Sequence, residues 1–371
     1  MPHLFDPLKV GPITIPNRIV VSPMCQYSAH NGAATDWHLQ HLSQMAISGA
    51  GLVMVEATGV EPQGRITLGC LGLYSDDTER ALKRVMESIR TSIAPDTVFG
   101  IQLAHAGRKG SCKRPWEDRG SPLLEQEGAW KTVAPSPIPF DSGFSIPHEV
   151  TVEEIEVLVE HFVQAARRAE RLGFQVIEIH SAHGYLLHQF LSPLSNHRQD
   201  EYGKDYYGRM KLGVEILSKV KRAVSSHIAV GARISGTDWA PNGLTLDDAV
   251  IYAKALQQHG ADYVCVSSGA LVPHVAIPVG PGYQVEFAER IKKEVPGLIT
   301  RAVGMIRTPQ EAEKIIVENR ADCVALARAF LDEPRWGWRA ADELGADILV
   351  PSQYDSVRSS KWKSPWNSSR V

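Results

Sequence analysis

The amino-acid sequence predicts an α/β protein built as a single closed (β/α)8 barrel, and three observations predict it. Eight short apolar segments rich in β-branched residues alternate with eight helical patterns, as in successive βα units of a parallel sheet. The chain has 371 residues, 43% of them hydrophobic, which is ample for a barrel of about 250 residues. The alternative, a doubly wound dinucleotide-binding sheet, requires a G-x-G-x-x-G sequence that this chain lacks, and no Walker A sequence is present either.

The expected strands are short runs dominated by Val, Ile, Leu and Phe. They cover residues 19–22, 52–58, 98–104, 174–180, 228–235, 262–268, 298–304 and 322–327. Between and after these runs, apolar residues recur at helical spacing. The expected helices cover residues 36–48, 76–92, 151–172, 208–224, 245–259, 284–295, 309–318 and 334–344.

Two of these helices carry clear start signals. Thr151 followed by Glu154 forms a capping box, and Gly173 follows the end of the same helix. Thr308 followed by Pro309 is a typical N-cap with proline at the first helical position.

The residues left over are distributed around the barrel and do not form a second domain, so residues 1–371 are expected to be one domain. Residues of about 3–17 are expected to cap the barrel floor as a hairpin. A long excursion at 106–150 follows the third strand. An aperiodic stretch of this length normally counts against an assignment, and we expect it to be the functional exception, a lid above the site. A further segment at 185–207 and a tail at 346–371 complete the chain.

Composition excludes several functional classes. The 39 basic and 42 acidic residues give a net charge of −3, so nucleic acid or an anionic membrane is not an expected partner. The five cysteines show no C-x-x-C spacing and are interpreted as free thiols in a reducing compartment. No run approaches the length of a membrane span, and the N-terminal residues lack the apolar stretch of a signal peptide. The expected location is therefore the cytoplasm.

Active sites of (β/α)8 barrels lie at the carboxyl ends of the strands, and the fourth expected strand ends in His180, His183 and Tyr185. Two imidazole N–H groups three residues apart can hold one carbonyl or phenolate oxygen. A tyrosine is protonated at neutral pH and can donate its proton to a developing carbanion. The alternative is a metal site that combines this pair with His105, although no carboxylate ligand is evident nearby.

Three further strand ends suggest a cofactor. Arg233 lies in an otherwise apolar strand and needs either an electron-rich ligand or a structural ion pair. Small residues at the last two strand ends allow a phosphate to approach the backbone, and Arg328 supplies charge; ordinary packing is the alternative.

Cys25 is either a nucleophile or, as its residue type favours, an inert buried thiol.

These strand-end residues closely resemble one family over nearly the whole chain. The matching segments are LFDPL at 4–8, SPMCQY at 22–27, IQLAHAGRK at 101–109, HSAHGYL at 180–186, NHR at 196–198 and AVGMI at 302–306. They resemble the old yellow enzyme family of flavin-dependent ene-reductases, and most of all its thermophilic-like and xenobiotic-reductase-like branch.

The resemblance implies a role for each matching residue. Positions around the isoalloxazine ring of non-covalently bound FMN are matched by Pro23, Met24, Cys25, Ala57, Gln102 and Arg233, and FMN-phosphate positions by Ala302, Gly304, Ala327 and Arg328. His180 and His183 match the pair that binds the substrate carbonyl, Tyr185 matches the proton donor, and Tyr27 would line the substrate pocket. Cys25 would then tune the flavin and would not act as a nucleophile. No metal site is implied.

The implied enzyme is an NADPH dehydrogenase or ene-reductase with ping-pong kinetics. NADPH or NADH would reduce FMN and leave. An α,β-unsaturated carbonyl compound would then receive hydride at Cβ and a proton from Tyr185 at Cα. A barrel metalloenzyme and a non-catalytic FMN-binding protein are the alternatives from other functional classes.

The sequence also departs from the family pattern. Arg301 stands where some relatives have a small residue, directly before Ala302, where others have a tryptophan. The tail resembles a segment that reaches a neighbouring subunit's site in some relatives. Its spacing after Tyr354 differs from that segment, so Arg358, Trp362 or neither residue takes this part. The likeness therefore implies a homodimer or homotetramer.

Overall fold

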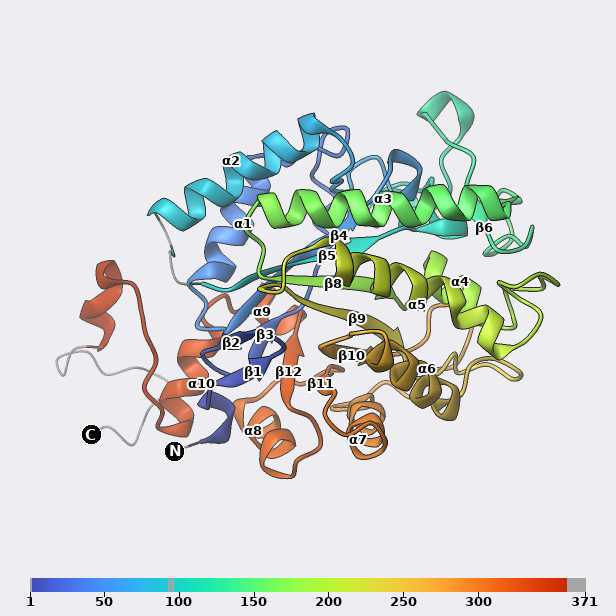
Figure 1. Cartoon of the computed structure of the whole chain (residues 1–371). Coiled ribbons are helices and arrows are strands. Elements are labelled where there is room, and N and C mark those ends of the chain that lie inside the picture. The colour runs from blue at the N-terminus through green and yellow to red at the C-terminus, as the bar shows by residue number, and fades with distance from the viewer. Residues whose placement is uncertain (1, 93, 95–96, 359–371) are drawn as a thin grey trace.

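Eight parallel strands close into a barrel in which each strand pairs with its neighbours in the sequence (Figure 1). They are β3 (Ile19–Val21), β4 (Leu52–Gly59), β5 (Phe99–Ala104), β8 (Val176–Ser181), β9 (Ala229–Ser235), β10 (Tyr263–Ser267), β11 (Ile299–Ala302) and β12 (Cys323–Leu326). Pairing of β12 with β3 closes the ring. This computed structural model describes residues 2–92, 94 and 97–358, and it confirms the predicted (β/α)8 barrel.

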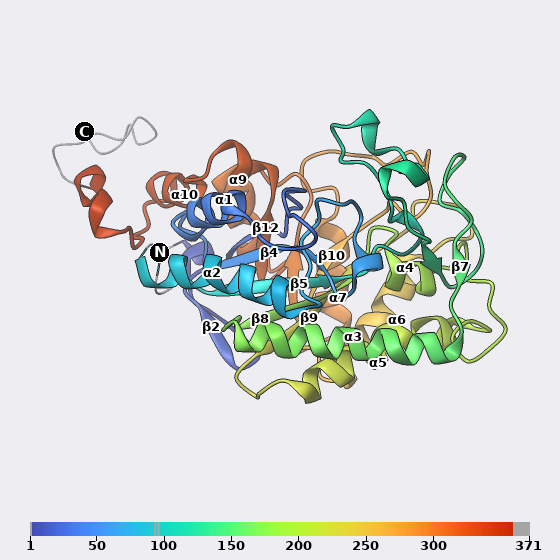
Figure 2. The same cartoon turned by 90° about the horizontal axis from the view of Figure 1, so that it is seen from above.

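Helices surround the barrel (Figure 2), and each predicted helix is present to within two residues at either end. They are α1 (Asp36–Ala46), α2 (Asp76–Ser92), α3 (Val152–Arg171), α5 (Tyr206–Ala223), α6 (Leu246–Gln258), α7 (Val285–Glu294), α8 (Pro309–Val317) and α10 (Trp336–Leu344). The capping box of α3 is confirmed, because the backbone N–H of Glu154 donates to Thr151 Oγ1 at 3.2 Å and the N–H of Thr151 donates to the Glu154 carboxylate at 2.7 Å.

Two short helices were not predicted. The helix α4 (Leu186–Leu191) is buried on every side, so its sequence shows no polar face, and α9 (Arg328–Asp332) is too short to show a period. Both follow directly on predicted site residues, and they orient the chain where it leaves the barrel.

The N-terminal hairpin caps the barrel floor, as predicted. Its strands β1 (Leu8–Val10) and β2 (Ile13–Ile15) pair antiparallel. Leu8, Val10 and Ile15 form one apolar cluster with barrel residues such as Met54 and Val176. The floor of the barrel is therefore closed by apolar packing, which leaves the opposite end for chemistry.

The excursion at 106–150 lies at the carboxyl end of the strands (Figure 2). It contains three short 3₁₀ turns, η3 (Gly107–Lys109), η4 (Asp118–Gly120) and η5 (Glu125–Glu127). It also contains a two-stranded sheet of β6 (Val133–Ala134) and β7 (His148–Glu149). In the tail, η6 (Ser352–Arg358) ends at Arg358, and Trp362 lies outside the described residues.

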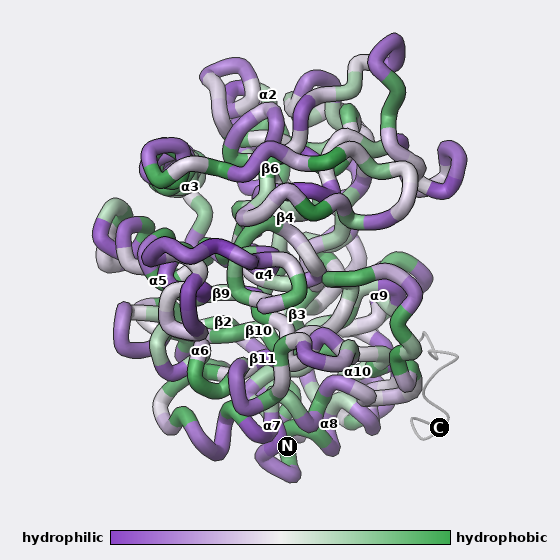
Figure 3. Tube along the Cα trace, turned by 90° about the vertical axis from the view of Figure 1, so that its right-hand side faces the viewer, coloured by the Kyte–Doolittle hydropathy of each residue, from purple (hydrophilic) through white to green (hydrophobic). Residues whose placement is uncertain are grey.

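In Figure 3, hydrophilic residues lie on the outward-facing turns of the helices. The barrel strands are buried. None of the helices in the described part of the chain combines the length and apolar character that a membrane crossing requires.

Candidate active site at the carboxyl end of the barrel

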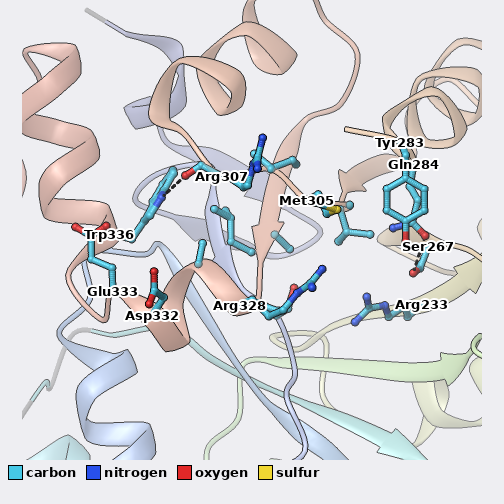
Figure 4. A pocket seen from close by; sticks show the side chains of 18 of the residues that line it. Arg233, Ser267, Tyr283, Gln284, Met305, Arg307, Arg328, Asp332, Glu333 and Trp336 are labelled. Carbon is cyan, nitrogen blue, oxygen red and sulfur yellow. Dashed lines mark hydrogen bonds between the residues drawn. The ribbon is translucent and has the colours of Figure 1, made fainter. Parts of the chain in front are cut away.

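A cavity of about 540 Å³ opens among the ends of β9 to β12 and the loops that follow β11 and β12 (Figure 4). This volume is in the range of small-molecule and cofactor sites. Among the residues that line it are four of the predicted cofactor residues, Arg233, Gly304, Ala327 and Arg328, together with Ser22, Ser267, Tyr283, Gln284 and Trp336.

Two guanidinium groups extend into this cavity, from Arg233 of β9 and from Arg328 at the start of α9 (Figure 4). Within the described residues neither forms an ion pair, and the buried Nε of Arg233 has no acceptor. The structural ion pair considered for Arg233 is therefore not formed there. Cationic groups without a protein partner beside a cavity suit an anionic or electron-rich ligand.

The loop after β11 brings backbone close to the same cavity. Gly304 has a φ of 118°, a conformation that favours glycine, and a Cβ at this position would lie 2.9 Å from Nε2 of Gln284. Ala302 behaves differently from the other predicted phosphate residues. It is fully buried in the core cluster shared with the helices, so its side chain does not line the cavity.

The rings of the three predicted catalytic side chains are in contact at the end of β8, with His180 edge-to-face against both His183 and Tyr185. The His180 ring centroid is 5.1 Å from that of His183 and 5.0 Å from that of Tyr185. Burial, reinforced by the positive charge of Arg233, lowers the pKa of both histidines well below the usual value. Burial raises the pKa of Tyr185 well above its usual value. At neutral pH the site therefore holds two neutral imidazoles and a protonated phenol.

Hydrogen bonds constrain which ring nitrogens carry protons. The backbone N–H of Ala182 donates to His180 Nδ1 at 3.3 Å, so the proton of that neutral ring is on Nε2. His183 Nε2 lies 2.7 Å from the hydroxyl of Ser267, which also lines the cavity. His183 adopts a φ of 59°, a strained conformation for a residue with a side chain.

Lys109 supports this strained turn. Its ammonium group donates to the backbone oxygens of His183 and Ala270, both at 2.9 Å, and lies 5.1 Å from the ring centroid of Tyr185. Burial and the neighbouring Arg108 lower the pKa of Lys109 to about 8. Sequence reasoning gave Lys109 no role, although it closes the matching segment 101–109.

A second, much smaller cavity lies beside Tyr185. Its volume of about 10 Å³ is just enough for one water molecule. Ala57, Cys70 and Ala106 are among the residues that line it. The structure thus places the predicted residue Ala57 next to Tyr185 and not in the larger cavity.

The loop after β3 holds Pro23, Met24, Cys25 and Tyr27, all half-buried. The backbone N–H of Gln26 donates to Glu56 at 3.1 Å, which ties this loop to β4. Burial, with a contribution from Glu56, raises the pKa of the Cys25 thiol well above its usual value, so the thiolate that a nucleophile needs is disfavoured. None of these four residues lines the larger cavity.

Tyr27 is held by the excursion, which sequence reasoning treated only as a lid. Trp116 packs edge-to-face on the Tyr27 ring at 5.8 Å, and Arg114 Nε donates to the Tyr27 backbone oxygen at 2.9 Å. Trp116 is itself 65% exposed. The excursion therefore contributes an aromatic side chain beside the predicted substrate pocket.

His105 is not part of the β8 cluster. Its Nε2 lies 2.7 Å from Glu61, whose other oxygen lies 2.9 Å from Nδ1 of His161. In the described part of the chain, no three His, Cys, Asp or Glu side chains form an arrangement that could hold a metal ion.

Comparison with known proteins places the fold and the site in context. The family model for the NADH:flavin oxidoreductase / NADH oxidase family matches residues 3–347. An NADPH dehydrogenase of Geobacillus thermodenitrificans is 44% identical over 354 residues, which cover 95% of this chain and 97% of that protein. An NADPH dehydrogenase of Bacillus subtilis is 42% identical, covering 95% of this chain and 98% of that protein.

Solved structures agree on the fold. The structure of morphinone reductase superposes with a TM-score of 0.76 at 25% identity, covering 95% of this chain and 92% of that one. Together with the sequence relatives and the family match, the barrel and its strand-end residues show that this chain belongs to the NADH:flavin oxidoreductase / NADH oxidase family, the old yellow enzyme family of flavin-dependent oxidoreductases.

Proposed function

We propose that this chain is an FMN-dependent ene-reductase, which uses NADPH or NADH to reduce the activated C=C bond of α,β-unsaturated carbonyl compounds. The observation that carries the proposal is the cluster of two neutral imidazoles and a protonated tyrosine at the end of β8. It lies near a cofactor-sized cavity lined by Arg233, whose Nε has no acceptor in the described part of the chain. FMN, when bound, supplies hydride transfer between the nicotinamide and the alkene.

The residues present suit FMN. Arg233 forms no ion pair with any residue that the structure describes and can bind the electron-rich pyrimidine edge of the ring. Gly304, Ala327 and Arg328 line the cavity where the backbone is close and positive charge is available for a phosphate. We assign Pro23, Met24, Cys25, Ala57 and Gln102 to the ring region, and Ala302 to the phosphate region through its backbone only.

The two histidines bind and polarise the substrate carbonyl. Because their pKa values are lowered, both imidazoles are neutral, and each has one N–H to donate. His183 donates from Nδ1 when its Nε2 accepts the hydroxyl proton of Ser267. His180 presents Nε2–H, since Nδ1 is occupied by the Ala182 backbone. Negative charge that develops on the carbonyl oxygen is stabilised by these preorganised donors.

Tyr185 holds the proton that the substrate needs at Cα. Its raised pKa keeps it protonated throughout the physiological range. The neighbouring cavity has room for one water molecule, from which the phenol would regain its proton after turnover. Tyr27, with Trp116 against its ring, lines the substrate pocket.

The proposal also covers the organisation of the protein. Residues 1–371 form one FMN-binding domain, located in the cytoplasm and assembled as a homodimer or homotetramer. The five free cysteines are consistent with a reducing compartment. Multi-angle light scattering of the purified protein tests the assembly, and a monodisperse monomer would contradict it.

An anaerobic titration tests the catalytic proposal. The purified protein should be yellow, bleach on addition of NADPH and regain its colour on addition of cyclohexenone. A colourless protein inactivated by chelators would favour a metalloenzyme. Bleaching without recovery of colour by any enone would indicate a flavin-binding protein without this activity.

A further inference from the structure

A polar layer crosses the interior of the barrel directly below the candidate site. It consists of Gln102, Glu178, Tyr263 and Arg301, which are each at most 2% exposed. Burying a carboxylate and a guanidinium together is costly unless their hydrogen bonds are well satisfied. The presence of this polar layer in a barrel interior therefore needs an explanation.

Strand register places the layer between the apolar floor and the strand ends. Gln102 of β5 pairs directly with Glu178 of β8, which is two residues before His180. Gly231 of β9 leaves the space that the Tyr263 ring fills, since a Cβ there would lie 2.4 Å from that ring. The layer thus supports the residues that face the cofactor cavity.

The hydrogen bonds of Glu178 determine how the Gln102 amide is oriented. Glu178 Oε2 accepts from Arg301 Nη1 at 2.9 Å and from the Tyr263 hydroxyl at 3.1 Å, and Oε1 accepts from Gln102 Nε2 at 2.8 Å. Glu178 forms an ion pair with Arg301 at 2.9 Å, and a carboxylate in such a pair accepts hydrogen bonds and donates none. The NH2 group of Gln102 must therefore face Glu178, and the amide oxygen must face away from it.

We propose that Glu178 is a positioning residue that fixes the Gln102 amide so that its oxygen is presented to the cofactor. The inference rests on the proposed function, in which Gln102 lies at the flavin ring. The pyrimidine edge of that ring carries an N–H group, for which an amide oxygen is the matching partner. The hydrogen bond of Gln102 within the described chain is the one that its NH2 group donates to Glu178, which leaves the amide oxygen for the cofactor in this proposal.

Arg301 belongs to the same hydrogen-bonded layer that orients the Gln102 amide. It ion-pairs with Glu178 across the barrel and stacks on the Tyr263 ring, with its Cζ 4.4 Å from the ring centroid. Its unusual presence at this position is explained by the buried charge of Glu178, which it compensates. The pair keeps an acceptor, and never a donor, opposite Gln102.

The isosteric variant Glu178→Gln tests the proposal. It can keep an oxygen for Arg301 and Tyr263 while placing an NH2 group opposite Gln102, which forces the Gln102 amide to turn over. We expect FMN to bind about 3- to 10-fold more weakly, the equivalent of losing one neutral hydrogen bond. The readout is FMN release on dilution of the holoenzyme, followed by the fluorescence of the free flavin.

A double-mutant cycle separates positioning from general structural damage. If Glu178 acts through Gln102, Glu178→Gln should have no further effect on FMN affinity in a Gln102→Ala background. A penalty of the same size in that background would overturn the proposal. Tyr263→Phe is the matched control, because it disturbs Oε2 of Glu178 and leaves Oε1 in place, and FMN affinity should stay within about twofold.

Folding is controlled separately. Thermal melting identifies any variant that fails to fold. If Glu178→Gln does, the charge-free variant Glu178→Gln with Arg301→Met takes its place in the same cycle. A wild-type protein that binds no FMN would reject the proposed function. A wild-type protein that binds FMN, with a penalty independent of Gln102, would reject only the positioning role.

Discussion

Burial gives the side chains at the end of β8 the chemistry that the proposed reaction requires. In water a histidine is partly charged at neutral pH, but His180 and His183 are kept neutral by burial and by Arg233. The same burial keeps Tyr185 protonated. A single environment thus prepares two donors for the carbonyl oxygen and one acid for the carbon.

Tyr185→Phe should separate the two halves of the reaction. Without the phenolic proton, alkene reduction should slow by about 10²- to 10⁴-fold, while bleaching of the flavin by NADPH stays nearly unchanged. Stopped-flow absorbance of each half-reaction measures this directly. An equal fall in both half-reactions would contradict the role of Tyr185 as proton donor.

Cys25→Ser tests what the thiol does. The raised pKa of Cys25 argues against a nucleophile, so turnover should continue with a changed flavin potential and changed ligand affinity. Steady-state assays and a potentiometric titration give the two readouts. Complete loss of turnover in a folded, yellow variant would point to covalent catalysis.

At the scale of elements, Glu61 joins three parts of the barrel wall. It lies between β4 and α2 and contacts His105 at the end of β5 and His161 of α3. Burial alone would raise the pKa of Glu61, but its close contacts with the two histidines outweigh burial and lower it well below the usual value. The same contact raises the pKa of His161.

We call the contacts of Glu61 with His105 and His161 the clasp, and these pKa shifts predict how its contribution to stability depends on pH. A carboxyl group with a lowered pKa stabilises the fold above its usual value of 4.5, and this contribution is lost as pH falls further. A histidine with a raised pKa stabilises the fold below its usual value of 6.5, and this contribution is lost as pH rises through the folded-state pKa. The clasp should therefore stabilise most between these two values.

The variant Glu61→Gln measures how much the clasp contributes to thermal stability. The difference in melting temperature between wild type and Glu61→Gln should be largest near pH 5 to 6 and should shrink toward both acid and alkaline pH. Thermal melts across pH 3 to 9 at constant ionic strength follow this difference. The control is Glu87→Gln, which removes the exposed ion pair between Lys83 and Glu87. A difference independent of pH would show that Glu61 acts by packing alone.

At the scale of the whole molecule, the two ends of the barrel have different roles. The closed floor contributes to stability, and the open upper end carries the candidate site. The hairpin β1–β2 seals one end with apolar packing, while the cavity, the β8 cluster and the excursion occupy the other. A ligand that fills the cavity binds only the folded protein, so it should stabilise the whole barrel.

FMN and riboflavin should stabilise the barrel to different degrees. At a hundredfold excess over its dissociation constant a ligand adds about 2.7 kcal/mol, and riboflavin lacks the phosphate that Gly304 and Arg328 would bind. Arg328→Ala should lower the FMN-induced rise in melting temperature toward that given by riboflavin. Thermal shift assays on the flavin-free protein compare the two ligands, and equal shifts in wild type would contradict the phosphate assignment.

Much of this molecule could be predicted from sequence because the relevant signals are local. Strand and helix periods, the Thr151 capping box and the His-x-x-His-Gly-Tyr segment are each contained in a few consecutive residues. Helix α4 was not predicted because it is buried on all sides and therefore lacks the polar face from which the periodicity of a helix is recognised. The cofactor role of Ala302 rested on strand position, and the structure turns its side chain to the outer core.

The sequence by itself determined the barrel, the order of its strands and which strand end carries the histidines and the tyrosine, because these follow from patterns within each βα unit. Only the tertiary structure decided that Arg301 meets Glu178 across 123 residues and that Glu178 meets Gln102. It also decided that Nε of Arg233 has no acceptor among the residues the structure describes. The physical reason is that hydrogen bonding and desolvation depend on which strands face each other inside the closed barrel. No local pattern encodes those distances.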